Sequence, residues 1–383
     1  MTTPPPLSLY LHLPWCVSKC PYCDFNSHRA GDKAPYGRYV KALQADIVTE
    51  AGKAGHRCVE SIFLGGGTPS LFSPAQLGAI LDTCRDKLVL AQDCEITMEA
   101  NPGTVEHGKL AAYRHAGVTR LSIGAQSFDP ALLIALGRVH GPEEIIAAFE
   151  EAQEADFDSI NIDLMFALPG QDLEGSRADV ARLVALGPSH VSYYQLTLEP
   201  NTGFYRQPPQ DLPDDELAWR IQEQGHRLLG SAGYERYEIS AFAKAGYRCR
   251  HNLNYWQFGD YLAAGAGAHG KLTDSGGRVS RYRKPANPLQ FMERAERGEL
   301  DAAPVTIEAA DLAFEFMLNV LRLADGVPGE LFLERTGLDP GLIEVPIRQA
   351  VADGLLQPLF DGRWRPTADG YRFLNDLQAR FLP

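Results

Sequence analysis

The chain has 383 residues, of which 45% are hydrophobic, and a formal net charge of −13. This length predicts two or three domains, the hydrophobic fraction excludes wholesale disorder, and the acidic balance argues against a primary role in binding nucleic acid. No Lys or Arg precedes Lys19, so the N-terminus does not resemble a secretion signal, and no apolar run is long enough to span a membrane. We therefore expect a cytoplasmic protein, with peripheral attachment to the membrane as an alternative.

Strand-like and helix-like segments alternate through the first two thirds of the chain. Tyr36–Ala54 repeats apolar residues at helical spacing, and Pro142 followed by two glutamates is typical of the first turn of a helix. Six strands are expected, at Leu7–Leu13, Val59–Leu64, Glu95–Ala100, Thr119–Ile123, Ser159–Met165 and His190–Leu196. This alternation predicts an α/β fold with a parallel sheet, either open or curled into a barrel.

Unusual residues follow the ends of successive strands. A cysteine cluster follows the first strand, a glycine run the second, Glu99–Asn101 the third and Gln126 the fourth. In folds of this kind the carboxyl ends of the strands carry the functional site. We therefore expect these residues to meet at one edge of the sheet.

The pattern changes after residue 200. The proline-rich stretch Glu199–Asp215 is expected to be a surface loop, followed by a helix at Asp215–Leu229 and one strand at Tyr234–Ala241. Leu355–Pro366 is typical of a hairpin that turns at Asp361-Gly362.

We divide the chain into a core barrel (1–230), a connecting segment (231–300) and a C-terminal helical module (301–383). Helices followed by a hairpin resemble a winged helix. The acidic composition of this module argues against DNA binding and favours a role in packing or as a lid.

Three of the seven cysteines, Cys16, Cys20 and Cys23, fall within eight residues. This clustering indicates a metal site rather than a set of disulfides. A zinc site completed by His12 or His28 is one alternative, although no second Cys-x2-Cys pair is present. A [4Fe–4S] cluster fits better, because three thiolates would leave its fourth iron open to a ligand.

The loop CVSKCPYC resembles the signature of the radical S-adenosylmethionine (SAM) superfamily, and GGGTPS, IGAQSF and NIDLMFALPG follow it in the expected order. This resemblance implies a partial (β/α)6 barrel of the TIM type, with a [4Fe–4S] cluster held by the three cysteines. It also implies that SAM chelates the open iron, that an electron from the cluster cleaves SAM to a 5′-deoxyadenosyl radical, and that an electron donor is a partner.

The resemblance covers nearly the whole chain and narrows to the branch that contains the coproporphyrinogen III dehydrogenase HemN and the haem chaperone HemW. The segments EITMEANPGT, LGRVH and HNLNYW resemble HemW. Phe25 stands where HemN has a fourth cysteine, and the first strand begins at Leu7 where HemN has a longer extension. Both departures argue against decarboxylation of coproporphyrinogen.

The same resemblance implies a SAM pocket. Arg138 suits the SAM carboxylate and Asp163 the ribose hydroxyls, while Tyr10 and Tyr22 match positions beside the cluster and the cofactor. Each of these residues also has an ordinary interpretation when taken singly. The glycines after the second strand could form a tight turn, the polar residues could be solvated, and Tyr10 could pack in the barrel. The full expected set for SAM is Tyr10, Tyr22, Gly66, Gly67, Thr68, Glu99, Gln126, Arg138 and Asp163.

A haem site is suggested by His251–Trp256, which resembles the HNxxYW motif of HemW. A neutral imidazole is a good axial ligand for haem iron, and the neighbouring aromatic rings can stack on a porphyrin. The alternative is a buried His251 with aromatic packing. Cys249 and His269 are further candidate haem ligands.

The sequence supports three hypotheses for the function of this protein. The leading hypothesis is a haem chaperone, rather than an enzyme, that delivers haem to acceptors such as respiratory haem proteins. The alternative is a radical SAM oxidoreductase that acts on a porphyrin or porphyrinogen, such as oxygen-independent coproporphyrinogen III oxidase, because the SAM pocket is intact. A zinc-dependent or nucleic-acid regulator is the weakest hypothesis.

Overall fold

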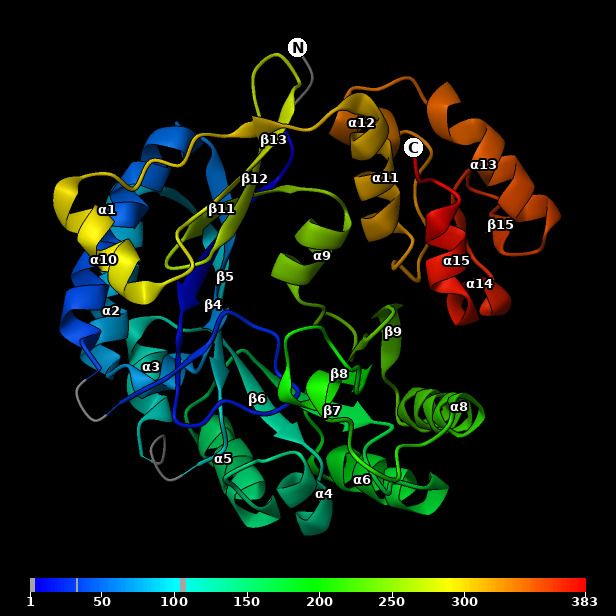
Figure 1. Ribbon diagram of the computed structural model, residues 1–383, viewed down its shortest axis with the longest axis horizontal. Coiled ribbons are helices and arrows are strands. Elements are labelled where there is room, and N and C mark those ends of the chain that lie inside the picture. The colour runs from blue at the N-terminus through cyan, green and yellow to red at the C-terminus, as the bar shows by residue number, and fades with distance from the viewer. Residues whose placement is uncertain (1–3, 32–33, 104–107) are drawn as a thin grey trace.

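A curved sheet of twelve strands organises the computed structural model, which describes residues 4–31, 34–103 and 108–383 (Figure 1). Its six central strands pair in parallel. They are β1 (Leu7–Leu13), β4 (Cys58–Gly66), β5 (Val89–Ala100), β6 (Arg120–Gln126), β7 (Ser159–Phe166) and β8 (His190–Gln195). Each overlaps one predicted strand, and the predicted partial barrel is confirmed.

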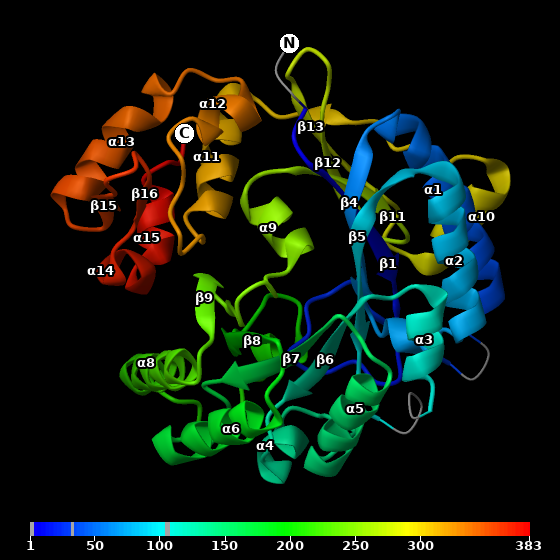
Figure 2. The same cartoon turned by 180° about the vertical axis from the view of Figure 1, so that it is seen from behind.

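Helices cover the outer face of this curved sheet (Figures 1 and 2). The longer ones are α1 (Tyr36–Ala54), α2 (Pro74–Lys87), α3 (Leu110–Ala116), α5 (Pro142–Glu154), α6 (Leu173–Leu186) and α8 (Asp215–Ser231). The turn η1 (Pro69–Leu71) and the helices α4 (Pro130–Ala135) and α7 (Gly203–Arg206) are short. Helix α5 begins as expected, with Pro142 in its first turn and the Glu144 carboxylate accepting the Gly141 N–H at 2.8 Å.

Residues 231–300 add strands to both edges of the six-stranded core. At the β8 edge, β9 (Glu235–Glu238) and β10 (Ala241–Ala243) pair antiparallel. The single strand predicted over Tyr234–Ala241 is therefore wrong. The Glu238 carboxylate accepts the Ser240 N–H at 3.0 Å and stabilises a turn at residues 239–240, which separates the two strands.

At the opposite edge, a parallel strand is followed by antiparallel ones. They are β11 (Asp260–Ala264), β12 (His269–Thr273), β13 (Val279–Arg283) and β14 (Val305–Thr306). Helix α10 (Pro288–Arg297) lies beside α1, and helix α9 (Arg250–Trp256) lies between the two edges of the sheet (Figures 1 and 2).

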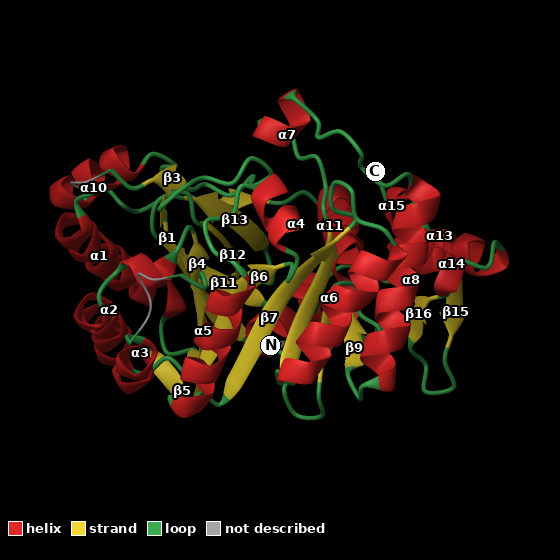
Figure 3. Cartoon of the chain, turned by 90° about the horizontal axis from the view of Figure 1, so that it is seen from below, coloured by secondary structure: helices red, strands yellow, loops and turns green. Residues whose placement is uncertain are grey.

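The C-terminal helices form a separate group at one end of the molecule (Figure 3). They pack around a second apolar core, which includes Phe316, Phe332 and Trp364 and to which Phe258 and Val279 of the connecting segment also belong. The elements are α11 (Ala309–Val320), α12 (Leu331–Thr336), α13 (Gly341–Ala352), the hairpin β15 (Leu356–Pro358) and β16 (Trp364–Pro366), α14 (Ala368–Arg372) and α15 (Leu374–Ala379). The expected hairpin and helical module are present, while the domain boundaries at 230 and 300 stay a prediction.

The interior of the barrel is polar. Side chains alternate between the two faces of a strand, so Glu95, Thr97 and Glu99 on β5 share the inner face. The neighbouring strands β6 and β7 add Arg120, Ser122, Asn161 and Asp163, which are linked in part by hydrogen bonds across the strands. No helix in the described ranges is long and apolar enough to cross a membrane.

Candidate functional site

A cavity of about 340 Å³ lies at the carboxyl ends of the parallel strands. Eleven of the thirteen predicted site residues line it: Cys16, Cys20, Tyr22, Cys23, Gly66, Gly67, Thr68, Glu99, Gln126, Arg138 and Asp163. Tyr10 and His251 do not. The parallel topology thus brings together residues from β4, β5, β6 and β7 with the cysteine segment that follows β1, as the sequence predicts.

Cys16 ends β2 (Trp15–Cys16), Cys20 and Cys23 lie on the loop between β2 and β3 (His28–Arg29), and all three are half-buried. Within the described residues, no three His, Cys, Asp or Glu side chains converge on one metal-ion position. A [4Fe–4S] cluster bonds each thiolate to a different iron, so its ligands surround a volume instead of meeting at a point. Burial raises the pKa of Cys16 and Cys23, so metal charge is needed to hold them as thiolates.

The alternative zinc ligands His12 and His28 both contact Asn26 of this loop. His12 Nε2 donates to the Asn26 carbonyl oxygen at 3.0 Å, and His28 Nε2 lies 3.3 Å from Asn26 Oδ1. Asn26 in turn donates through Nδ2 to the carbonyl oxygens of Ala266 and Ala286. Neither histidine lines the cavity.

The glycines after β4 are required by close packing within the protein. Gly66 has φ +107°, and a Cβ there would meet the His12 ring at 2.3 Å. A Cβ on Gly67 would meet the Trp15 carbonyl oxygen at 2.6 Å. The tight-turn interpretation therefore has a direct physical basis, and it places Thr68 in the cavity wall beneath the cysteine loop.

Two carboxyl groups face the cavity from β5 and β7. Burial, with a further contribution from Asp163, raises the pKa of Glu99 to about 8, although the Gly66 N–H donates to Glu99 Oε2 at 3.1 Å. Burial also raises the pKa of Asp163, against the hydrogen bond from Asn161 Nδ2 at 2.7 Å. This wall is suited to hydrogen-bond donors or a positive group on a ligand.

Arg138 provides a cation on the other side of the cavity. Its Nη2 donates to Asn101 Oδ1 at 2.7 Å and to the Gly124 carbonyl oxygen at 2.8 Å, and Nη1 lies 3.6 Å from Cys20 Sγ. Its Nε is buried and has no partner among the described residues. An orphaned guanidinium N–H beside the cavity fits a ligand carboxylate.

Gln126 ends β6 with φ +74°, a conformation that is costly for a residue with a side chain. Tyr194 on β8 donates its hydroxyl to Gln126 Oε1 at 2.8 Å. Tyr194 also lines the cavity, and sequence reasoning missed its part in the site. Alternation along β8, which puts it on the face of His190 and Ser192, is the signal that would have indicated it.

Asn101 is a second residue of the site that sequence reasoning did not identify. Its Nδ2 donates to Thr68 Oγ1 at 2.8 Å, while its Oδ1 accepts from Arg138. It therefore connects the glycine turn with the arginine. Its position directly after a strand was the available signal.

Tyr10 and His251 lie together elsewhere in the barrel. The ring centroid of Phe63 is 5.0 Å from that of His251 and 6.3 Å from that of Tyr10. His251 Nδ1 is 3.3 Å from Ser61 Oγ. Burial lowers the pKa of His251 to about 4, so the imidazole is neutral at physiological pH.

The other candidate haem ligands are placed differently. Cys249 is fully buried, burial raises the pKa of its thiol to about 12, and the thiol donates to Glu95 Oε1 at 3.4 Å. His269 is exposed and lines another cleft, with Arg283 and Arg294. Of the three candidates, His251 alone combines a neutral imidazole with a position among aromatic rings inside the barrel.

Comparison with known proteins agrees with the fold and the site. A profile of the radical SAM superfamily matches residues 10–183, and a profile of the HemN C-terminal domain matches residues 307–373. The solved structure of Escherichia coli coproporphyrinogen III oxidase (HemN), titled a radical SAM enzyme, superposes with a TM-score of 0.82 at 23% identity, covering 99% of this chain and 90% of that one. This likeness shows a shared radical SAM fold.

Relatives of similar length narrow the assignment. The chain is 48% identical over 378 residues to Heme chaperone HemW of Escherichia coli strain K12, covering 99% of this chain and 98% of the relative. It is 36% identical over 377 residues to Heme chaperone HemW of Mycobacterium tuberculosis strain H37Rv, covering 95% and 93%. The chain therefore belongs to the HemW family of the radical SAM superfamily, and the predicted family is confirmed.

A [4Fe–4S] cluster and SAM are the cofactors of the radical SAM superfamily, and the residues present fit both. Three half-buried thiols border the same cavity as the orphaned Arg138 Nε–H and the carboxyl groups of Glu99 and Asp163. SAM carries a carboxylate, a positive sulfonium and ribose hydroxyls, which complement these groups in charge and hydrogen bonding.

Proposed function

We propose that this chain is a haem chaperone, which binds haem and passes it to acceptor haem proteins. The observation that carries the proposal is the match along nearly the whole chain to relatives that bear the name heme chaperone. The neutral imidazole of His251, which lies among aromatic rings at the barrel interior, supports it. Respiratory haem proteins as acceptors and a cytoplasmic location are part of the proposal.

Within this function, Cys16, Cys20 and Cys23 would ligate the [4Fe–4S] cluster. When bound, the cluster supplies an electron to SAM, so an electron donor is a further proposed partner. Arg138 would bind the SAM carboxylate. The remaining SAM contacts would come from the other cavity residues: Tyr22, Gly66, Gly67, Thr68, Glu99, Gln126 and Asp163.

Tyr10 is proposed as a neighbour of SAM, although it does not line the cavity and lies near its wall residue Glu99. Its hydroxyl lies 3.1 Å from His12 Nδ1, and burial together with the nearby Glu99 raises the pKa of Tyr10, so the phenol stays protonated. The same ring stacks on Phe63, which also contacts His251. The ring of Phe63 therefore connects Tyr10 with the proposed haem ligand.

His251 is the proposed haem ligand. His251→Ala should reduce haem affinity and shift the Soret band, because the axial nitrogen is lost, whereas His269→Ala should change neither. Titration of the reconstituted protein with haem, followed by transfer to an apo-haem protein, measures both properties. Unchanged affinity and spectrum in His251→Ala would reject this ligand.

The second candidate function, a radical SAM oxidoreductase for porphyrinogens, is favoured only by the intact SAM pocket. Incubation of reconstituted protein with coproporphyrinogen III, SAM and a reductant distinguishes the two functions. Formation of protoporphyrinogen would establish the enzyme. Haem transfer without that product would support the chaperone.

A further inference from the structure

Glu95 makes an unusual set of contacts with the segment that carries His251. Its carboxylate, on the inner face of β5, accepts the Arg250 N–H at 3.0 Å and the His251 N–H at 3.3 Å. It also accepts from the Cys249 thiol at 3.4 Å. One side chain more than 150 residues away in sequence thus holds three successive residues at the start of α9.

These bonds take the place of an ordinary helix cap. The first N–H groups of a helix have no partner within the helix, and a side chain at the residue before it usually accepts them. Cys249 occupies that position in α9 and provides no such acceptor. The negative charge of Glu95 also complements the positive end of the helix.

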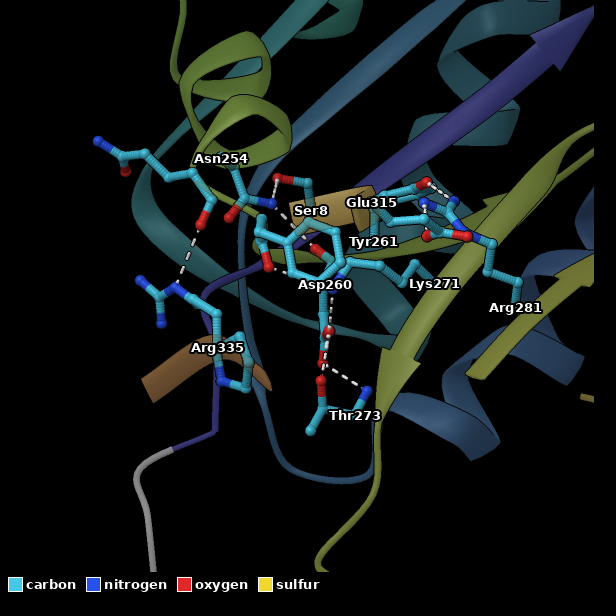
Figure 4. Close-up of polar contacts among 12 residues, drawn as sticks. Ser8, Asn254, Asp260, Tyr261, Lys271, Thr273, Arg281, Glu315 and Arg335 are labelled. Atoms are coloured by element: carbon cyan, nitrogen blue, oxygen red, sulfur yellow. Dashed lines mark hydrogen bonds and ion pairs between the residues drawn. The ribbon is translucent and has the colours of Figure 1, made fainter. Parts of the chain in front are cut away.

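Helix α9 is short and only partly buried, although it contacts β1, β4, β11 and α11. The helix has seven residues and none of them is fully buried, whereas isolated helices of this length are marginal in water. Its other end is held by Asn254, whose Nδ2 donates to Ser8 Oγ and to the Asp260 carbonyl oxygen, both at 2.9 Å (Figure 4). Arg335 Nε donates to the carbonyl oxygen of Gln257 just beyond the helix, at 3.3 Å (Figure 4).

Glu95 has a buried cationic neighbour in the barrel. Arg120, on the adjacent strand, is 3% exposed, and its Nε and Nη2 have no hydrogen-bond partner among the described residues. Glu95 and Cys249 are among the ionisable neighbours of this guanidinium. Replacing Glu95 by a neutral residue therefore removes a charge that both the buried cation and the helix amides require.

We propose that Glu95 is a positioning residue for haem binding, which orients His251 by anchoring the first turn of α9 to the barrel wall. This role rests on the proposed function, in which His251 ligates haem iron. His251 projects from that first turn toward Ser61 and Phe63 on β4. A displaced first turn would carry the imidazole away from these contacts.

The matched control is Asp93, two residues earlier on the same strand. Its carboxylate pairs with the Arg250 side chain at 2.8 Å but is largely exposed. Asp93→Asn removes a charge from the same strand and a contact to the same helix, without touching the backbone amides. Glu95→Gln keeps the size of the side chain while removing its charge.

The test measures haem affinity in Glu95→Gln, Asp93→Asn, His251→Ala and the double variant Glu95→Gln/His251→Ala, all with the cluster reconstituted. Glu95→Gln should weaken haem binding about tenfold, the loss typical of a charge-assisted hydrogen bond. Asp93→Asn should leave it within about twofold. In the His251→Ala background, Glu95→Gln should have no further effect, because its action passes through the imidazole.

Hydrogen exchange of residues 250–256 in the haem-free protein gives an independent readout. Faster exchange in Glu95→Gln than in Asp93→Asn would support the anchoring role. This readout does not depend on haem, so it holds even if His251→Ala leaves haem binding unchanged and His251 is thereby rejected as the ligand. Unchanged exchange would overturn the anchoring role. Equal losses of haem affinity from Glu95→Gln with and without His251 would also overturn it, since they indicate general destabilisation.

Discussion

At the scale of single residues, burial in the barrel interior shifts the pKa of side chains away from the values they have in water. Glu99 is the clearest case, because burial raises its pKa to about 8 and the protein without ligand holds it protonated at neutral pH. Sequence reasoning could place this side chain at a strand end. It could not indicate the protonation state, which depends on the depth of the barrel and on Asp163 across it.

The protonation of Glu99 predicts a pH dependence of SAM binding. The positive sulfonium and the hydroxyl donors of SAM favour the ionised carboxylate, so at low pH binding must first remove a proton. Raising the pH from 6.5 to 8 should therefore strengthen SAM binding, by at most about tenfold per pH unit, and the gain should end above the pKa. Calorimetric titration of the reconstituted protein with SAM measures this slope.

Glu99→Gln is the control, since an amide does not titrate in this range. In this variant, the pH dependence of SAM affinity comes only from the titration of SAM and of other groups. The difference between the two profiles belongs to Glu99. Parallel profiles for the two proteins would contradict the assigned role of the carboxylate.

At the scale of elements, the sequence predicted what depends on local pattern and missed what depends on tertiary contacts. The six central strands were predictable because apolar and alternating runs reflect burial in a parallel sheet. The turn between β9 and β10 was missed because the Glu238 side chain makes it. The packing of His251 against Ser61 joins residues 190 positions apart, and local pattern carries no information about such a contact.

The cysteine loop gives a prediction at this scale. Cys16, Cys20 and Cys23 border one cavity, whereas Cys58, Cys84, Cys94 and Cys249 do not line it. Replacing the three loop cysteines by Ala should leave anaerobically reconstituted protein with little iron and without the broad visible absorbance of a cluster. Cys58→Ala with Cys94→Ala should keep both, and full iron and sulfide in the triple variant would refute the ligand assignment.

At the scale of the whole molecule, the C-terminal module is joined to the rest of the protein by an apolar cluster that Phe258 shares with Phe316, and by charged contacts around α9 and β9. Arg322, just after α11, lies over the Trp256 ring at 4.2 Å and pairs with the buried Glu238 at 3.4 Å. Trp256 ends the helix that carries His251. The module therefore contacts the proposed haem-binding helix directly, although the sequence showed it only as a separate acidic unit.

This interface predicts the effect of Arg322→Ala on stability. Burial raises the pKa of Glu238 and Arg322 opposes that shift, so removing the cation leaves a buried carboxylate without its ion pair and raises the pKa further. A carboxyl group with a raised pKa destabilises the folded state as pH rises through that pKa. The loss of unfolding free energy should therefore be about 1–3 kcal/mol at pH 8 and smaller at pH 5, where Glu238 binds a proton more readily.

Urea unfolding of the full chain, followed by tryptophan fluorescence at both pH values, measures this difference. Arg348→Ala is the matched control, because Arg348 forms an exposed pair with Glu344 within α13 and should have little effect at either pH. A loss in Arg322→Ala that is equal at pH 5 and pH 8 would indicate that stacking on Trp256 is the main contribution. A loss confined to high pH would assign it to Glu238, because Trp256, the other partner of Arg322, carries no charge that changes with pH.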